Sequence, residues 1–173
     1  MTYLLTFNCY GTRIPGDERG WYDRARVNHR GGYQNPSPGL AHYARKIMPQ
    51  EPYRLDVPRA RIVLDAICEV CQCRGWDLVA SHVRTTHVHV IVSSLSDPDR
   101  AISDFKSYSS RALNRPGYET ADRKRWARGG STRQLPTAEA LRSAIQYVVN
   151  GLGDPMAVFQ CTQQSQPTSP PAH

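Results

Sequence analysis

The sequence predicts an α+β fold, in which an antiparallel sheet carries helices on one face and a further helix follows at the C-terminal end. Short apolar segments with alternating polarity predict strands. Longer segments with apolar residues at i, i+3 and i+4 predict helices between them. The resulting order is strand, helix, strand, strand, helix, strand, with one helix appended. This is the ferredoxin-like arrangement, which leaves the second face of the sheet open.

The length and charge of the chain limit its organisation and its partners. A chain of 173 residues is one ordinary domain, and 22 Lys and Arg against 15 Asp and Glu give a net charge of +7. This balance favours a polyanionic partner, most simply nucleic acid. We assign residues 1–153 to the domain. We expect residues 154–173, dominated by Gln, Ser, Thr and Pro, to be a disordered tail.

The N-terminal part begins with a strand and continues into a long insertion. Residues Thr2 to Tyr10 form the predicted strand, and residues 11–56 form an irregular insertion rich in Gly, Pro, Arg and Tyr. A short helix is predicted there at Leu40 to Ile47. The next helix starts at Pro58, with Asp56 as its cap, and ends at Gly75.

The remaining elements follow from capping and turn residues. Asp97 is the expected cap of a helix that closes near Asn114, and Thr137 is the expected cap of the last helix, which ends near Asn150. Three strands are predicted, the last of them an edge strand or hairpin that turns at two glycines: Trp76 to Val83, Thr86 to Ser93, and Arg125 to Leu135.

A histidine pair is the clearest sign of chemistry in the chain. His87 and His89 alternate in an apolar strand, so they share one face with Ile91 while the valines between them face the other way. Two adjacent imidazoles suit a divalent metal ion or a phosphate. The alternative is a pair of partly buried, hydrogen-bonded sheet histidines. We expect the pair on the open face of the sheet, which Asn8 could share. His82 could lie behind the site, and the alternative is a plain sheet histidine.

One tyrosine of the last helix lies away from the apolar stripe of that helix. Tyr147 is about a third of a turn from the stripe and shares its side with small residues, so it is free to contact something else. A tyrosine can attack a phosphodiester and hold the end of a strand as a phosphotyrosine. Tyr108, by contrast, lies at the edge of the stripe of its own helix and is expected to pack.

Arginine is concentrated between the third helix and the end of the edge strand, which predicts contacts to phosphates. For Trp126, stacking on an unpaired base and packing in the core are equally plausible. The predicted DNA-binding residues are Arg111, Arg125, Trp126, Arg128 and Arg133.

An ordered set of segments resembles a known family. The chain resembles the HUH-type single-tyrosine transposases, close to the REP-associated tyrosine transposase group. The histidine-hydrophobic-histidine triplet alone is weak, whereas the ordered set is specific and covers Tyr3 to about Gly153. The segments are Thr6 to Thr12, Pro15 to Trp21, His82 to Val90, Lys106 to Leu113, Trp126 to Arg133 and Ala144 to Val148.

The resemblance implies a fold, a chemistry and a substrate. It implies a ferredoxin-like domain in which His87 and His89 bind Mg²⁺ or Mn²⁺. Tyr147 would cleave single-stranded or hairpin DNA, leaving a 5′-phosphotyrosine and a free 3′-hydroxyl, and reversal of this step would join strands. We expect no membrane partner and either a monomer or a homodimer. We expect a cytoplasmic protein, associated with the nucleoid when bound to DNA.

The chain departs from the family pattern after the tyrosine. The family usually has a glutamine there as a third metal ligand, but Tyr147 is followed by Val148, Val149 and Asn150. Asn150, one turn beyond Tyr147, is the candidate third ligand. The departure keeps open a second function, that of a domesticated protein that binds DNA hairpins with weak or no cleavage. A third possibility is an unrelated metal-dependent hydrolase that adds Asp65 or Asp77 to the histidine pair.

Overall fold

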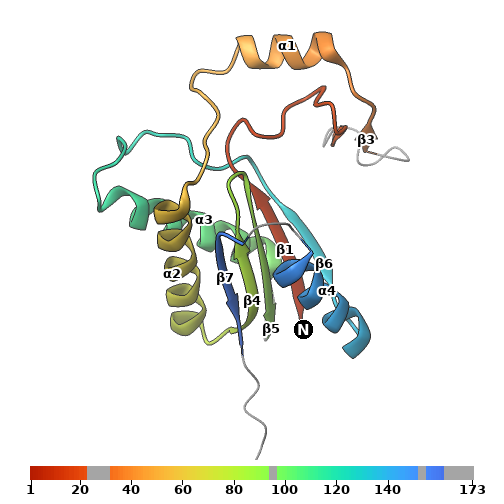
Figure 1. The fold of residues 1–173 in the computed structure, drawn as a ribbon, viewed down its shortest axis with the longest axis vertical. Coiled ribbons are helices and arrows are strands. Elements are labelled where there is room, and N and C mark those ends of the chain that lie inside the picture. Colours follow the sequence, from red (N-terminus) through yellow and green to blue (C-terminus); the bar gives the residue numbers. More distant parts are fainter. Residues whose placement is uncertain (23–31, 94–96, 152–154, 162–173) are drawn as a thin grey trace, which may run out of the picture.

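The structure is a computed structural model that describes residues 1–22, 32–93, 97–151 and 155–161. Its centre is a five-stranded antiparallel sheet (Figure 1). In spatial order the strands are β6 (Ser131–Gln134), β1 (Tyr3–Asn8), β5 (His87–Ser93), β4 (Asp77–Val83) and β7 (Ala157–Gln160).

The first four of these strands and two helices reproduce the predicted ferredoxin-like plan. The chain runs through β1, α2 (Val57–Arg74), β4, β5, α3 (Pro98–Asn114) and β6. β5 lies between β1 and β4 and is antiparallel to both. The α+β prediction is therefore confirmed.

The predicted helix caps are confirmed at atomic detail. The side chain of Asp56 accepts a hydrogen bond from the backbone N–H of Arg59, and that of Asp97 accepts one from Arg100. Thr137 caps α4 (Ala138–Asn150) in the same way. α2 ends at Gly75, whose φ of 67° is left-handed, the conformation that favours glycine.

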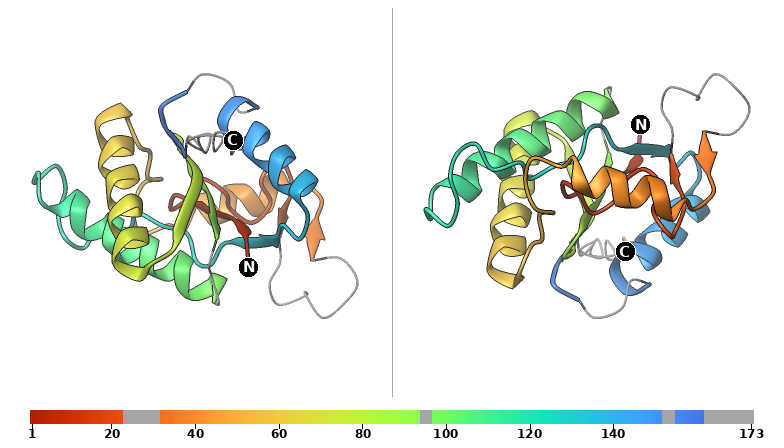
Figure 2. Two further views of the ribbon diagram at one scale, coloured as in Figure 1. Left: turned by 90° about the horizontal axis from the view of Figure 1, so that it is seen from below. Right: turned by 90° about the horizontal axis from the view of Figure 1, so that it is seen from above.

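The main core lies between the sheet and helices α2 and α3. Leu5 and Phe7 of β1 and the valines of β5 point to this side, and all are fully buried. Figure 2 shows these two helices on one side of the sheet and α4 on the other. The expectation that the second face is open is therefore wrong in part. Apolar side chains of this face pack against Ala144 and Val148 of α4, namely Leu4, Ala80 and Ile91.

The prediction of a disordered tail over residues 154–173 is wrong for Ala157–Gln160, whereas residues 162–173 lie outside the described part of the chain. Ala157–Gln160 form β7, which pairs antiparallel with β4 and extends the sheet at that edge. Ala157 is buried in the main core. A four-residue strand among polar residues has too little periodicity to be recognised, and its formation depends on hydrogen bonds to an edge strand distant in sequence.

Residues 125–135 form an edge strand but no hairpin. β6 pairs with β1, and Trp126 forms a separate bridge to Cys9 farther along the same edge. Both parts therefore run along one side of β1, and residues 128–130 bulge out between them. The two glycines serve this bulge instead of a reversal of the chain.

The structure describes the insertion between β1 and α2 except for residues 23–31. It contains α1 (Pro38–Lys46), one to two residues from the predicted helix, and a short pairing of β2 (Trp21–Tyr22) with β3 (Tyr33–Gln34). It lies beyond the end of the sheet where β4 turns into β5 (Figure 1). No helix within the described residues is long and apolar enough to cross a membrane.

Candidate active site

The strand register places polar side chains around the histidine pair. His87 lies directly across from Asn8 of β1, and His89 lies across from Thr6. On the other side of β5, His82 of β4 lies across from His89. Directly opposed residues of antiparallel strands share a face, so we call the face that carries these residues the histidine face.

The two imidazoles are close together and their Nδ1 atoms are engaged. Their ring centroids are 4.9 Å apart, with the rings nearly perpendicular. His89 Nδ1 lies 2.9 Å from Thr6 Oγ1, and His87 Nδ1 lies 3.0 Å from Thr86 Oγ1. Nε2 is therefore the ring atom of each histidine that is left for a ligand. His89 Nε2 is buried and has no hydrogen-bond partner in the part of the chain that the structure describes.

Both histidines are held in the neutral form. Burial, followed by the nearby positive charge of Arg84, lowers the pKa of His87 to about 4. Burial, with His87 as a neighbour, lowers the pKa of His89 to about 3. Desolvation disfavours a charged imidazole. A neutral imidazole with a free Nε2 is the form that binds a metal ion.

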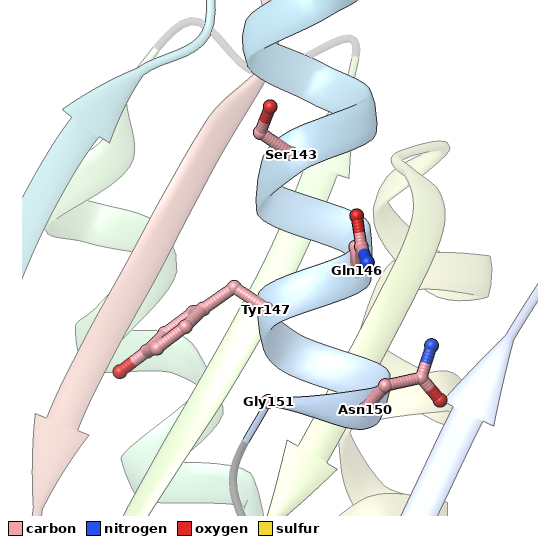
Figure 3. Close-up of a pocket in the computed structure, with 5 residues that line it drawn as sticks. All are labelled: Ser143, Gln146, Tyr147, Asn150 and Gly151. Atoms are coloured by element: carbon pink, nitrogen blue, oxygen red, sulfur yellow. The ribbon is translucent and has the colours of Figure 1, made fainter.

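Tyr147 of α4 reaches over this pair. Its ring centroid lies 5.6 Å from that of His89, in an edge-to-face arrangement. The side chain is 46% exposed, although the helix packs firmly through Ala144 and Val148. In Figure 3 the phenol projects from α4 across the sheet toward β1. The predicted freedom of this tyrosine is visible in the structure.

A surface groove runs beside the tyrosine. We call it the tyrosine groove, and it brings together residues of β1, β5, β6 and α4. Its lining residues are Leu4, Thr6, His89, Ser131, Arg133, Ser143 and Tyr147.

His82 fixes the end of α4 that carries the tyrosine. Its imidazole is fully buried. Nδ1 lies 2.9 Å from the carbonyl oxygen of Val148, and the backbone N–H of Met156 donates to Nε2 at 3.4 Å. One imidazole of β4 thus holds both α4 and the segment that leads into β7.

A comparison with known protein families identifies the family of the chain. The model of the family described as "Transposase IS200 like" matches residues 52–150, which include the histidine pair and Tyr147. The chain belongs to the IS200-like transposase family. Its resemblance to the HUH single-tyrosine transposases is confirmed at this level.

One solved structure similar to the chain is described as the REP-associated tyrosine transposase bound to a REP hairpin. The identity is 14% and the TM-score is 0.47; the match covers 85% of this chain and 63% of that chain. The chain therefore spans somewhat less than two thirds of that protein. No curated protein matches the sequence.

In this IS200-like chain, the Nε2 atoms of His87 and His89 are suitable ligands for a metal ion. An unpartnered buried Nε2 beside a second neutral imidazole is the arrangement expected of a metal-ligand pair. Among the described residues, no group of three or more His, Cys, Asp or Glu surrounds a common point. Asn150 as third ligand stays a prediction. In Figure 3 its amide leaves α4 on the side away from the Tyr147 ring.

Three of the predicted DNA-binding residues are exposed, two along the β6 edge of the sheet and one on its opposite face. Arg133 lines the tyrosine groove beside the nucleophile candidate. Arg128 lies in the bulge between β6 and the Trp126 bridge, along the same edge of β1. Arg111 belongs to α3, on the opposite face of the sheet, where its guanidinium stacks on the ring of Tyr108.

The structure corrects the prediction for Arg125 and favours core packing for Trp126. The Arg125 side chain is 2% exposed; it forms an ion pair with Glu119 and donates to Asn114. The Trp126 indole N–H donates to Lys106 O and Ser110 Oγ. The Trp126 ring also packs edge-to-face on Phe7. Sequence proximity to other arginines cannot reveal that a guanidinium is buried against a carboxylate.

The carboxylates considered for a hydrolase lie away from the histidine pair. Asp65 is exposed on α2, on the opposite face of the sheet. Asp77 pairs in register with Ser93, at the other end of β5 from His87. Thr6 and Ser131 are site residues that the sequence did not reveal, since only the register of β1 with β5 and β6 brings them there.

Proposed function

We propose that this IS200-like chain cleaves and rejoins single-stranded or hairpin DNA, with Tyr147 as the nucleophile and a divalent metal ion, Mg²⁺ or Mn²⁺, held by His87 and His89. The observation that carries the proposal is the position of a half-exposed tyrosine, whose ring centroid lies 5.6 Å from that of a buried histidine. Nε2 of this histidine has no partner among the residues that the structure describes. Family membership supports the same chemistry.

The reaction requires few groups. The Tyr147 hydroxyl oxygen forms a bond to phosphorus while the bond from phosphorus to the 3′-oxygen breaks, which leaves a 5′-phosphotyrosine and a free 3′-hydroxyl. The reverse attack by a 3′-hydroxyl joins strands. When bound, a divalent ion supplies charge stabilisation at a non-bridging phosphate oxygen.

The residues of the chain orient and hold these partners. Thr6 and Thr86 fix the ring orientations of His89 and His87 through Nδ1. His82 holds the C-terminal part of α4, and with it Tyr147. Arg133 supplies positive charge along the tyrosine groove, where a flanking phosphate can lie.

The test is an assay for a covalent protein–DNA adduct on a denaturing gel. The full chain is incubated with single-stranded palindromic oligonucleotides and Mg²⁺ or Mn²⁺. Wild type is expected to form an adduct that needs the metal. Tyr147→Phe should lower its yield by at least roughly 10³-fold because the nucleophile is lost. The matched control is Tyr108→Phe, which removes a hydroxyl from a tyrosine stacked with Arg111 on the far face.

The same assay distinguishes this function from a second one, that of a protein that binds hairpins without cutting them. The absence of the usual glutamine and of a third His, Cys or carboxylate near the pair in the described residues favours it. Salt-sensitive hairpin binding with no adduct under either metal would establish that function and refute the proposed one. An adduct of equal yield in Tyr147→Phe would instead show that another residue is the nucleophile.

A further inference from the structure

Arg84 lies at the end of the histidine face, next to the turn between β4 and β5. Its backbone N–H donates to the carbonyl oxygen of His87 at 2.9 Å, so the two residues face each other across the β4–β5 turn. Arg84 follows His82 by two residues, and alternation therefore places its side chain on the same face as His82 and His87. Neighbouring strands are roughly 5 Å apart, so Arg84 is the next side chain along the sheet from His87.

The guanidinium of Arg84 is incompletely satisfied. Its Nη1 is buried, and no acceptor among the described residues binds it. An arginine has five N–H donors in a rigid fork and normally pairs with an anion when it is removed from water. Arg125 shows the usual solution in the same chain, with Glu119 and Asn114 as partners. Within the described parts of the chain, Arg84 has no such carboxylate.

Further positive charge comes to the same end of the sheet from the insertion. The Thr12 hydroxyl donates to Thr86 O at 3.2 Å, which fixes the chain just before Arg13 against the β4–β5 turn. Arg13 is exposed on this segment, and Arg19 follows it six residues later. Arg19 is already bound to Asp17. Arg84 and Arg13 form no ion pair with another residue that the structure describes, and both are therefore available for an external anion.

We propose that Arg84 binds a backbone phosphate of the DNA strand next to the phosphate that Tyr147 attacks. This inference rests on the proposed function, because it places the strand across the histidine face. The strand would run from the tyrosine groove, past His89 and His87, to Arg84 at the turn. A guanidinium fork matches a phosphate in shape and charge. The contact would position the strand without reading its sequence.

The first test measures DNA binding without metal and without cleavage. The affinity of the full chain for a hairpin with a single-stranded flank is measured in EDTA at several salt concentrations, by fluorescence anisotropy. Arg84→Gln should bind about tenfold more weakly, and the slope of log K against log salt should shrink by roughly 0.7 to 0.9, the loss of one phosphate contact. The matched control is Arg61→Gln, which removes an exposed arginine from α2 on the opposite face.

A second test locates the phosphate. Each phosphate of the strand in turn is replaced by an uncharged methylphosphonate. One replacement should weaken binding to wild type and have no further effect on Arg84→Gln. Arg84→Lys, which keeps the charge but loses the fork, should bind with intermediate affinity.

A structural role for Arg84 gives a different result. Because its buried Nη1 has no partner in the described structure, Arg84→Gln should keep or raise the Tm measured without DNA. A marked fall in Tm, or wild-type affinity and salt slope in Arg84→Gln, would overturn the proposal. Wild-type binding by Arg84→Gln together with a Tyr147-dependent adduct would refute this inference alone. A lost phosphate contact without any adduct would refute only the cleavage function.

Discussion

At the scale of single residues, the Thr6 hydroxyl determines what His89 offers to a ligand. Thr6 Oγ1 engages Nδ1 of the imidazole at 2.9 Å, so Nε2 is the ring nitrogen that is left without a partner among the described residues. Residues that orient metal-binding histidines in this way are important for metal affinity.

Replacement of Thr6 by valine is therefore expected to weaken metal binding while the fold is kept. Thr6→Val keeps the shape of the side chain but removes the hydrogen bond, and the affinity for Mn²⁺, measured by calorimetry without DNA, should fall by roughly 10- to 100-fold. Thr2→Val is the control, since Thr2 bonds to Ser93 at the other end of the same strand pair. An unchanged affinity in Thr6→Val, or an equal loss in both variants, would contradict the role given to this hydroxyl.

At the scale of elements, α4 is positioned by one buried imidazole. His82 bonds to the carbonyl oxygen of Val148, one residue after the tyrosine, and accepts from Met156 on the way to β7. The two elements that follow β6 are thus connected to β4 through the same ring. The placement of the tyrosine above His89 depends on this connection as well as on the apolar packing of Ala144 and Val148.

We expect His82→Leu to loosen α4 without abolishing DNA binding. The substitution leaves the Val148 carbonyl and the Met156 N–H without their partner, which should lower the free energy of unfolding by about 1–3 kcal/mol. Hydrogen exchange of residues 145–150 should increase, and adduct formation should fall more than hairpin affinity. His42→Leu, at an exposed position of α1, serves as the control. Unchanged exchange in α4 would show that apolar packing alone holds the helix.

The elements also show which features a sequence reveals. The caps Asp56, Asp97 and Thr137 act within three residues, and the alternation of His87 and His89 is equally local, so all of these were predictable. The docking of α4 on the histidine face, the strand β7 and the burial of Arg125 depend on partners far away in the chain. The polar residues around β7 predicted a disordered tail instead of a strand. The arginines around Arg125 predicted a DNA contact instead of a buried ion pair.

At the scale of the whole molecule, one chain contains both the histidine pair and the tyrosine of the proposed site. The family match begins at residue 52, after β1, yet β1 supplies Thr6 and Leu4 to the tyrosine groove. The tyrosine lies over the histidine of its own chain. We therefore expect a site completed by a single copy, whether the protein is a monomer or a homodimer.

Mixing two inactive variants tests this arrangement. His89→Ala keeps the tyrosine but lacks one member of the histidine pair, and Tyr147→Phe keeps the pair but lacks the nucleophile. If each copy uses its own residues, an equimolar mixture should form no more adduct than either variant alone. The adduct assay with Mn²⁺ measures this, with wild type diluted by Tyr147→Phe as the reference for half the number of active sites. Adduct on the His89→Ala chain in the mixture would show instead that Tyr147 works with the histidines of a partner subunit, which would require α4 to leave its own sheet.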